Sequence, residues 1–148
     1  MNARWTLHQT LPAALDTLDD IAAIVLKAAD RVGLSRQAAY RLRLAVDEIA
    51  TNIVTHGYAE HALDGVIDVL AEGDDDELVI TLEDDAPAYT PDLTATPESL
   101  DAPLEAREVG GLGLYLATLN VDEFRYDRID NRNRHTFVVR RADSEKED

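Results

Sequence analysis

Three short stretches of this 148-residue sequence combine residue types that could bind a phosphorylated ligand. In the first, Glu48 and Asn52 lie four residues apart in a run with helical apolar spacing, so both side chains project from one helix face. A carboxylate at Glu48 could accept a proton from a water or hydroxyl, and the Asn52 carbonyl oxygen suits Mg²⁺. The Glu-x-x-x-Asn spacing alone is also common on ordinary helix surfaces.

The second stretch is a glycine cluster that opens an apolar run, with Gly110, Gly111 and Gly113 interleaved with Leu112 and Leu114. Closely spaced glycines let the backbone approach a ligand, and a helix N-terminus favours phosphate. The cluster is not a P-loop, because no Gly-Lys-Ser/Thr follows. It is not a Rossmann fingerprint either, because a long proline-containing stretch rather than a strand precedes it.

The third stretch follows an expected buried strand and reads Asp84, Asp85, Ala86, Pro87, Ala88. A carboxylate that emerges from a strand end into a pocket can accept a hydrogen bond from an adenine amino group. In a chain this acidic, the same run also fits a solvated turn.

The sequence between these stretches predicts the helices that would hold them. Apolar residues recur at helical spacing between Pro12, which fits a helix start, and Gly33, which fits a helix end. Ser35 fits the N-cap of a second helix, which carries the Glu-x-x-x-Asn pair and is ended by Gly57. A third helix is expected over residues 110–120.

Strands are expected around these helices, at residues 5–11, 66–70, 78–82, 123–128 and 135–140. Turn-forming runs at residues 73–76 and 130–133 join them into two hairpins. Residues 84–108, polar and rich in proline, have the length of a lid or binding loop. The element order predicts an α/β two-layer sandwich, with a mixed, mostly antiparallel sheet and helices packed on one face.

Composition limits the classes of function. The formal net charge of −16 repels nucleic acid and anionic lipid headgroups, so neither is an expected partner. The chain has no cysteine, which excludes disulfides and thiolate sites, and no apolar run of the roughly 20 residues that cross a bilayer. With no signal-peptide pattern at residues 1–10, a cytoplasmic location is expected. One domain is expected over residues 1–141, followed by a charged, disordered tail at 142–148.

The order of these patterns is more specific than any one of them. A helix with Glu-x-x-x-Asn, a strand ending in Asp, a lid-length loop and a helix opened by glycines resemble the Bergerat-fold ATPases. That superfamily includes gyrase, heat-shock chaperone ATPases, histidine kinases and mismatch-repair ATPases. The chain looks most like the anti-sigma-factor serine kinases. The resemblance extends over about residues 7–140, and its most specific parts are residues 46–58 and 109–115; residues 101–105 look like one branch of that family.

The resemblance implies roles for individual residues. It implies ATP and Mg²⁺ as cofactors, with Glu48 as catalytic base, Asn52 as Mg²⁺ ligand and Asp84 as the residue that recognises adenine. The glycine box Gly110-Gly111-Leu112-Gly113-Leu114 would hold the phosphates, and Arg107 could reach a phosphate or a partner protein. The family's first glycine box usually reads Asp-x-Gly-x-Gly. Here Ala86 and Ala88 occupy the two glycine positions of that adenine-binding segment.

The resemblance also implies protein partners. An anti-sigma serine kinase phosphorylates an anti-anti-sigma factor and holds a sigma factor inactive, and such proteins are usually homodimers. A second reading is a nucleotide-dependent protein-binding module of the same fold that transfers no phosphate, which Ala86 and Ala88 favour.

Two further readings fit less well. A sensor histidine kinase needs a preceding helical hairpin with a phosphorylatable histidine, and only His8 precedes the Glu-x-x-x-Asn helix. A histidine metal site is disfavoured because His56 and His61, the closest pair, have a spacing that does not suit one helix face.

Overall fold

The computed structural model describes residues 4–59, 63–87 and 120–141. The segments at 1–3, 60–62, 88–119 and 142–148 lie outside the described residues, and with them the expected loop, third helix and tail. The elements are β1 (Trp5–Pro12), the 3-10 turn η1 (Leu15–Thr17), α1 (Leu18–Val32), α2 (Arg36–Asn52), the π-helical turn η2 (Ile53–Tyr58), β2 (Val66–Gly73), β3 (Glu77–Asp84), β4 (Glu123–Ile129) and β5 (Arg132–Arg140).

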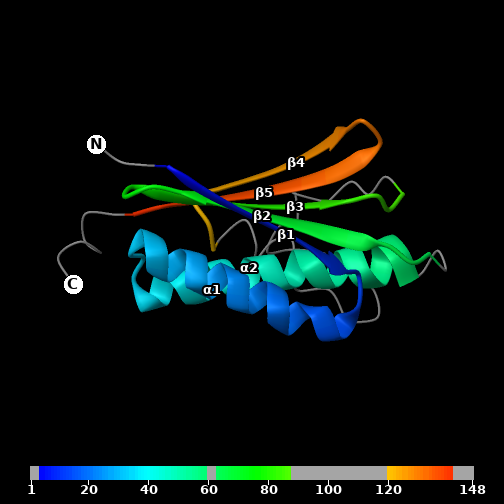
Figure 1. Ribbon diagram of the computed structural model, residues 1–148, viewed down its shortest axis with the longest axis horizontal. Helices are drawn as coiled ribbons and strands as arrows, with labels where there is room; N and C mark the ends of the chain where they lie inside the picture. The colour runs from blue at the N-terminus through cyan, green and yellow to red at the C-terminus, as the bar shows by residue number, and fades with distance from the viewer. Residues whose placement is uncertain (1–3, 60–62, 88–119, 142–148) are drawn as a thin grey trace, which may run out of the picture.

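The strands form one five-stranded sheet in the order β1-β2-β3-β5-β4. All four pairings are antiparallel, and no parallel pairing occurs among the described strands. Both long helices pack on the same face of the sheet, with α1 over β2 and β3 and α2 over β5 (Figure 1). The predicted α/β two-layer sandwich is confirmed.

The two helices begin and end where local chemistry dictates. Gly33 ends α1 in the left-handed region with φ of 84°, and its N–H donates to the Ala29 and Asp30 carbonyls at 3.0 Å. Ser35 caps α2, because its hydroxyl oxygen accepts a hydrogen bond from the Ala38 N–H at 3.1 Å. These two boundaries agree with the prediction.

Three expected boundaries are wrong. Pro12 does not start a helix: it is the last residue of β1, an edge strand where a missing N–H costs little. Gly57 does not end the second helix, which continues through it as η2 to Tyr58. The second hairpin turns at Asp130 and Asn131 alone, both with positive φ (53° and 64°), so the rest of the expected four-residue turn belongs to β5.

The core lies between the helix layer and the inner face of the sheet. Alternate residues of β2 and β3 are buried there, as the period of two in a strand requires. The largest fully buried side chains include Phe137, Ile21, Leu42, Ile49, Ile67, Leu78, Ile80 and Leu82. In the described ranges no helix is both long and apolar enough to cross a membrane.

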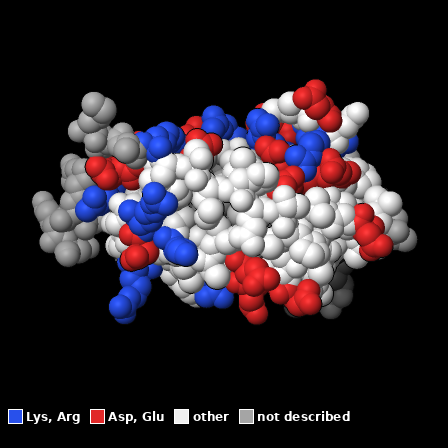
Figure 2. Space-filling view, viewed as in Figure 1, with Lys and Arg blue, Asp and Glu red and all other residues white. Residues whose placement is uncertain are grey.

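The outer face of the sheet carries ion pairs instead. Arg132 contacts carboxylates of Asp68 at 2.6 Å, Glu83 at 2.9 Å and Asp85 at 2.8 Å, which links β2, β3 and β5. Arg4 contacts a second acidic group near the other end of the sheet. Acidic and basic side chains are accordingly interspersed along the upper edge of the molecule in Figure 2, above the largely uncharged band in the middle of that view.

Candidate functional site

Polar side chains that the sequence analysis placed in a ligand site are buried at one end of the molecule. Asp84 ends β3 and is 1% exposed, and Asn52 ends α2 and is 6% exposed. The end of β3, the β4–β5 turn and the helix continuation η2 all lie at the right-hand end of Figure 1. Buried polar groups usually have hydrogen-bond partners. A buried donor or acceptor without a partner therefore marks a place where a ligand atom could bind.

Asp84 has one oxygen engaged and one without a partner. Its Oδ1 accepts hydrogen bonds from the Ala86 N–H at 2.9 Å and from Asn133 Nδ2 at 2.8 Å. Its Oδ2 is buried and has no hydrogen-bond partner among the described residues. A buried acceptor left in this state costs free energy unless a ligand supplies a donor. Burial raises the pKa of Asp84, and the bonds from Asn133 and Ala86 oppose that shift.

Asn133 was missed by the sequence analysis, which assigned it to a turn. The two-residue turn instead places it in β5, directly opposite Asp84. Its Oδ1 accepts from the Tyr126 hydroxyl and from Arg128 at 2.9 Å, so two residues of β4 support it. The turn-forming pair Asp130-Asn131, read as a two-residue hairpin turn, could have placed Asn133 in β5, but not opposite Asp84.

The helix continuation fixes the turn that follows Asp84. The Tyr58 hydroxyl accepts from the Asp85 N–H at 2.8 Å and donates to the Val66 carbonyl at 3.0 Å. A Cβ added to Gly57 would lie 3.1 Å from the Cβ of Ala86, so the helix backbone approaches this turn closely. Gly57 therefore lies at a close contact between helix and turn rather than at a helix end.

The same contact shows where the alanine methyl of the first glycine box goes. Ala86 is 1% exposed and its Cβ packs against Gly57. A glycine in the facing helix thus accommodates the methyl group that departs from the family pattern. Ala88 lies outside the described residues.

Glu48 and Asn52 differ in exposure although both belong to α2. Glu48 is exposed, whereas Asn52 is buried and its Nδ2 has no partner in the described ranges. An exposed carboxylate is accessible to a group on another molecule, and a buried Nδ2 without a partner is a donor that an acceptor atom of a ligand could use. The neighbouring Asp47 forms an ion pair with Arg43 at 3.5 Å, and burial raises its pKa.

His135 lies one inward-facing position from Asn133 along β5 and is 1% exposed. Burial lowers its pKa to about 4, and neither ring nitrogen has a hydrogen-bond partner among the described residues. The imidazole is therefore neutral near pH 7, and it packs against the rings of Phe124 and Tyr126 with centroids 6.3 and 5.0 Å away.

The remaining predicted site residues, Gly110, Gly111, Leu112, Gly113 and Leu114, lie outside the described residues, as does Arg107. The structure thus brings Asp84 together with Ala86 and Asn133, with η2 packed against them. The position of the glycine box stays a prediction.

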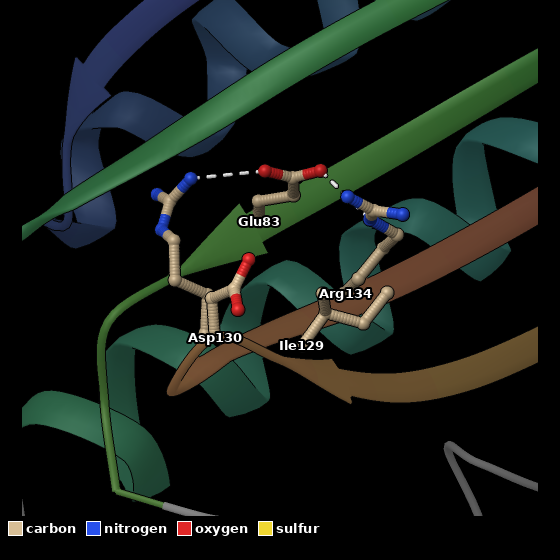
Figure 3. A pocket seen from close by; sticks show the side chains of 5 residues that line it. Glu83, Ile129, Asp130 and Arg134 are labelled. Atoms are coloured by element: carbon tan, nitrogen blue, oxygen red, sulfur yellow. Dashed lines mark hydrogen bonds and ion pairs between the residues drawn. The ribbon is translucent and has the colours of Figure 1, made fainter.

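A hollow of about 180 Å³ is separate from this site. Glu83, Ile129, Asp130, Arg132 and Arg134 line it, and Figure 3 shows the Glu83 and Arg134 side chains joined by an ion pair. Glu83 adjoins Asp84 in β3, and successive strand residues face opposite sides, so this hollow is on the outer face of the sheet.

Comparisons with known proteins find similarity over most of the chain. Residues 11–139 match the family described as histidine kinase-like ATPase domain. The chain is similar to a serine-protein kinase RsbW of Halalkalibacterium halodurans, with 29% identity over 80% of this chain and 73% of the relative. A serine-protein kinase RsbW of Staphylococcus aureus (strain JH9) is 26% identical over 79% of this chain and 76% of the relative.

Proposed function

Because the chain belongs to the histidine kinase-like ATPase domain family, we propose that it binds ATP with Mg²⁺ and phosphorylates a serine of a protein partner. The partner class is the anti-anti-sigma factor, and the kinase in turn sequesters a sigma factor. The similarity to two serine-protein kinases supports the reaction class. The observation that carries the proposal is the buried Asp84 oxygen that lacks a hydrogen-bond donor.

Asp84 is proposed to bind the adenine. Its Oδ1 is held by two donors, which leaves Oδ2 as an acceptor for the exocyclic amino group of adenine. The turn after Asp84 is fixed by Tyr58 and Gly57, so the acceptor is positioned before the ligand arrives.

Asn52 is proposed to hold the metal. An amide oxygen is a hard ligand suited to Mg²⁺, and Asn52 is buried at the end of α2, so its Oδ1 is the proposed ligand. Its Nδ2, which lacks a partner among the described residues, is a hydrogen-bond donor and suits an anionic ligand oxygen rather than the metal itself. Mg²⁺ would offset the negative charge of the triphosphate in a protein whose own net charge is −16. Gly110, Gly111 and Gly113 are proposed to donate backbone N–H groups to the phosphates.

Glu48 is proposed as the base that accepts the proton of the incoming serine hydroxyl. It lies on the same helix face as Asn52, and its exposure supports access by a side chain from a second protein. The rival function is a nucleotide-dependent binding module without phosphoryl transfer. The alanine at position 86 had favoured this rival function. Because the Ala86 methyl packs against Gly57, it need not occupy space used by the ligand, and this argument for the rival is weaker.

Nucleotide binding tests the site. We expect wild-type protein to bind ATP more tightly with Mg²⁺ than without it, as measured by titration calorimetry. Asn52→Ala should remove most of the Mg²⁺ dependence. Asp84→Asn, which replaces an acceptor with an amide, should weaken ATP binding roughly tenfold or more by leaving polar groups mismatched. Wild-type protein that binds no ATP would overturn the proposed function.

Phosphoryl transfer is tested separately. Radiolabelled ATP and a cognate antagonist protein should give labelled serine with the wild type and at least about 100-fold less with Glu48→Gln, whose ATP affinity should be unchanged. Tight ATP binding without any transfer by the wild type would favour the binding module.

A further inference from the structure

Asn133 and Asp84 form a buried pair across two neighbouring strands. Asn133 is 2% exposed and Asp84 is 1% exposed, and the strand register places them opposite each other. Asn133 Nδ2 donates to Asp84 Oδ1 at 2.8 Å. No role in the sequence patterns or in the family comparison was assigned to Asn133.

The orientation of the Asn133 amide is determined on both of its sides. Nδ2 faces acceptors only: Asp84 Oδ1, the Ala86 carbonyl at 3.1 Å and the Pro87 carbonyl at 3.3 Å. Oδ1 accepts from the Tyr126 hydroxyl and from Arg128 at 2.9 Å, and the guanidinium of Arg128 can only donate. A flipped amide would set donors against donors and acceptors against acceptors, so only one orientation is compatible with these neighbours.

The fixed orientation of the Asn133 amide determines from which ligand groups Asp84 can accept a hydrogen bond. One carboxylate oxygen is held by two N–H donors, and rotation of the carboxylate would break both bonds. The second oxygen keeps a constant direction and, in the ionised form, can only accept a hydrogen bond. Such an acceptor matches the amino group at position 6 of adenine and is mismatched with the oxygen at position 6 of hypoxanthine or guanine.

We propose that Asn133 is a positioning residue that determines purine selectivity, because it holds the Asp84 carboxylate as a fixed acceptor for a 6-amino group. The proposal rests on the proposed ATP-binding function and adds to it the reason why a 6-oxo purine is rejected. Tyr126 and Arg128 contribute indirectly, because their hydrogen bonds to Oδ1 hold the Asn133 amide in place.

Ionisation gives the proposal a pH dependence. Burial raises the pKa of Asp84, and the Asn133 hydrogen bond opposes this, so loss of that bond raises the pKa further. A protonated carboxyl group can donate to a 6-oxo group, so discrimination is lost as the pH falls through the raised pKa. The charged and titratable groups around Asp84 are Arg132 and His135 on β5, Tyr126 and Arg128 on β4, Tyr58 on η2, and Asp85.

The experiment compares the affinities for ATP and inosine triphosphate, whose bases differ only at ring positions 1 and 6, from pH 5.5 to pH 8.5. Wild-type protein should prefer ATP by roughly tenfold or more at pH 8. In Asn133→Ala the preference should fall to about threefold or less at pH 8, and the pH at which it is lost should be higher than in the wild type. A merely structural defect would weaken both nucleotides equally at every pH.

Two variants complete the test. Tyr126→Phe removes one donor to Asn133 and should shift the ratio in the same direction by a smaller factor, which decides the question if Asn133→Ala does not fold. Arg134→Gln, on the opposite face of β5, should leave the ratio unchanged. An unchanged ATP preference and pH profile in the folded Asn133 variant, or in Tyr126→Phe where the former does not fold, would overturn the inference. Absence of ATP binding by the wild type would instead contradict the proposed function.

Discussion

At the scale of single residues, one hydroxyl group joins three parts of the chain. Tyr58 lies in η2, donates to the start of β2 at Val66 and accepts from the backbone N–H of Asp85 after β3. Burial raises the pKa of Tyr58, so the hydroxyl stays neutral and can donate and accept at once. The turn that follows Asp84 therefore depends on a residue 26 positions earlier in the chain.

Tyr58→Phe should lower the free energy of unfolding by about 1–3 kcal/mol, because it removes both hydrogen bonds and leaves the Asp85 N–H unsatisfied. Urea unfolding followed by circular dichroism measures the change. Tyr40→Phe is the matched control, since Tyr40 is 56% exposed on α2 and should lose almost nothing. Equal midpoints for the two variants would contradict the role of the hydroxyl.

At the scale of elements, the β4–β5 hairpin determines which residues face the site. Its turn contains only Asp130 and Asn131, both in the left-handed region, which suits the twist of the strands. The turn aligns Arg128 with Asn133, and β3 aligns Asp84 with the same residue. A shift of one residue would turn Asn133 to the outer face of the sheet.

Asn131→Val should destabilise the protein by about 1–2 kcal/mol, because a β-branched residue is strained at φ of 64°. Asn131→Gly, which accepts this φ freely, should be at least as stable as the wild type. Thermal unfolding of the pair measures the difference. A valine variant as stable as the glycine variant would show that the turn conformation differs.

Most helices and strands, and some of the residues of the candidate site, could be predicted from the sequence. Apolar periodicity located the helices and strands because burial imposes it. It placed Asp84 after a buried strand and Asn52 on one face of the second helix. Asn133 escaped because its role depends on register between strands far apart in the chain, which periodicity does not encode. Gly57 was assigned as a helix stop because its actual reason, the approach of Ala86, is a tertiary contact.

At the scale of the whole molecule, the net charge is −16, yet some of the carboxylates form ion pairs with arginine side chains. Asp68 is paired: burial would raise its pKa, but hydrogen bonds from Thr10, Arg132 and His8 lower it from 3.8 to about 2. Asp68 thereby keeps its charge at pH values below the ordinary range of a carboxyl group. Ion pairs of the outer face of the sheet join strands β2, β3 and β5, and hydrogen bonds of Asp68 with His8 and Thr10 add β1.

Asp68→Asn tests this pairing. A depressed carboxyl pKa stabilises the fold above the unfolded-state pKa, and the contribution disappears as the pH falls through the folded-state value. The variant should therefore be about 1 kcal/mol less stable at pH 6, after allowance for solvent screening of partly exposed partners, and the gap should close between about pH 4 and pH 2. Urea titrations at several pH values measure it, and Asp75→Asn, at an exposed turn position, should show no such gap. A gap that persists at pH 2 would contradict the assignment.

The contact between Gly57 and Ala86 is tight, because a second methyl group at position 57 would lie 3.1 Å from the Ala86 Cβ and helix or turn would have to shift. The methyl group could come from an alanine at either position, provided that the other position is glycine. An exchange of the two side chains, with alanine moved to 57 and glycine to 86, conserves the filled volume, whereas alanine at both positions overfills it. The two positions are thus one structural unit, and any redesign of the segment after Asp84 must treat them together.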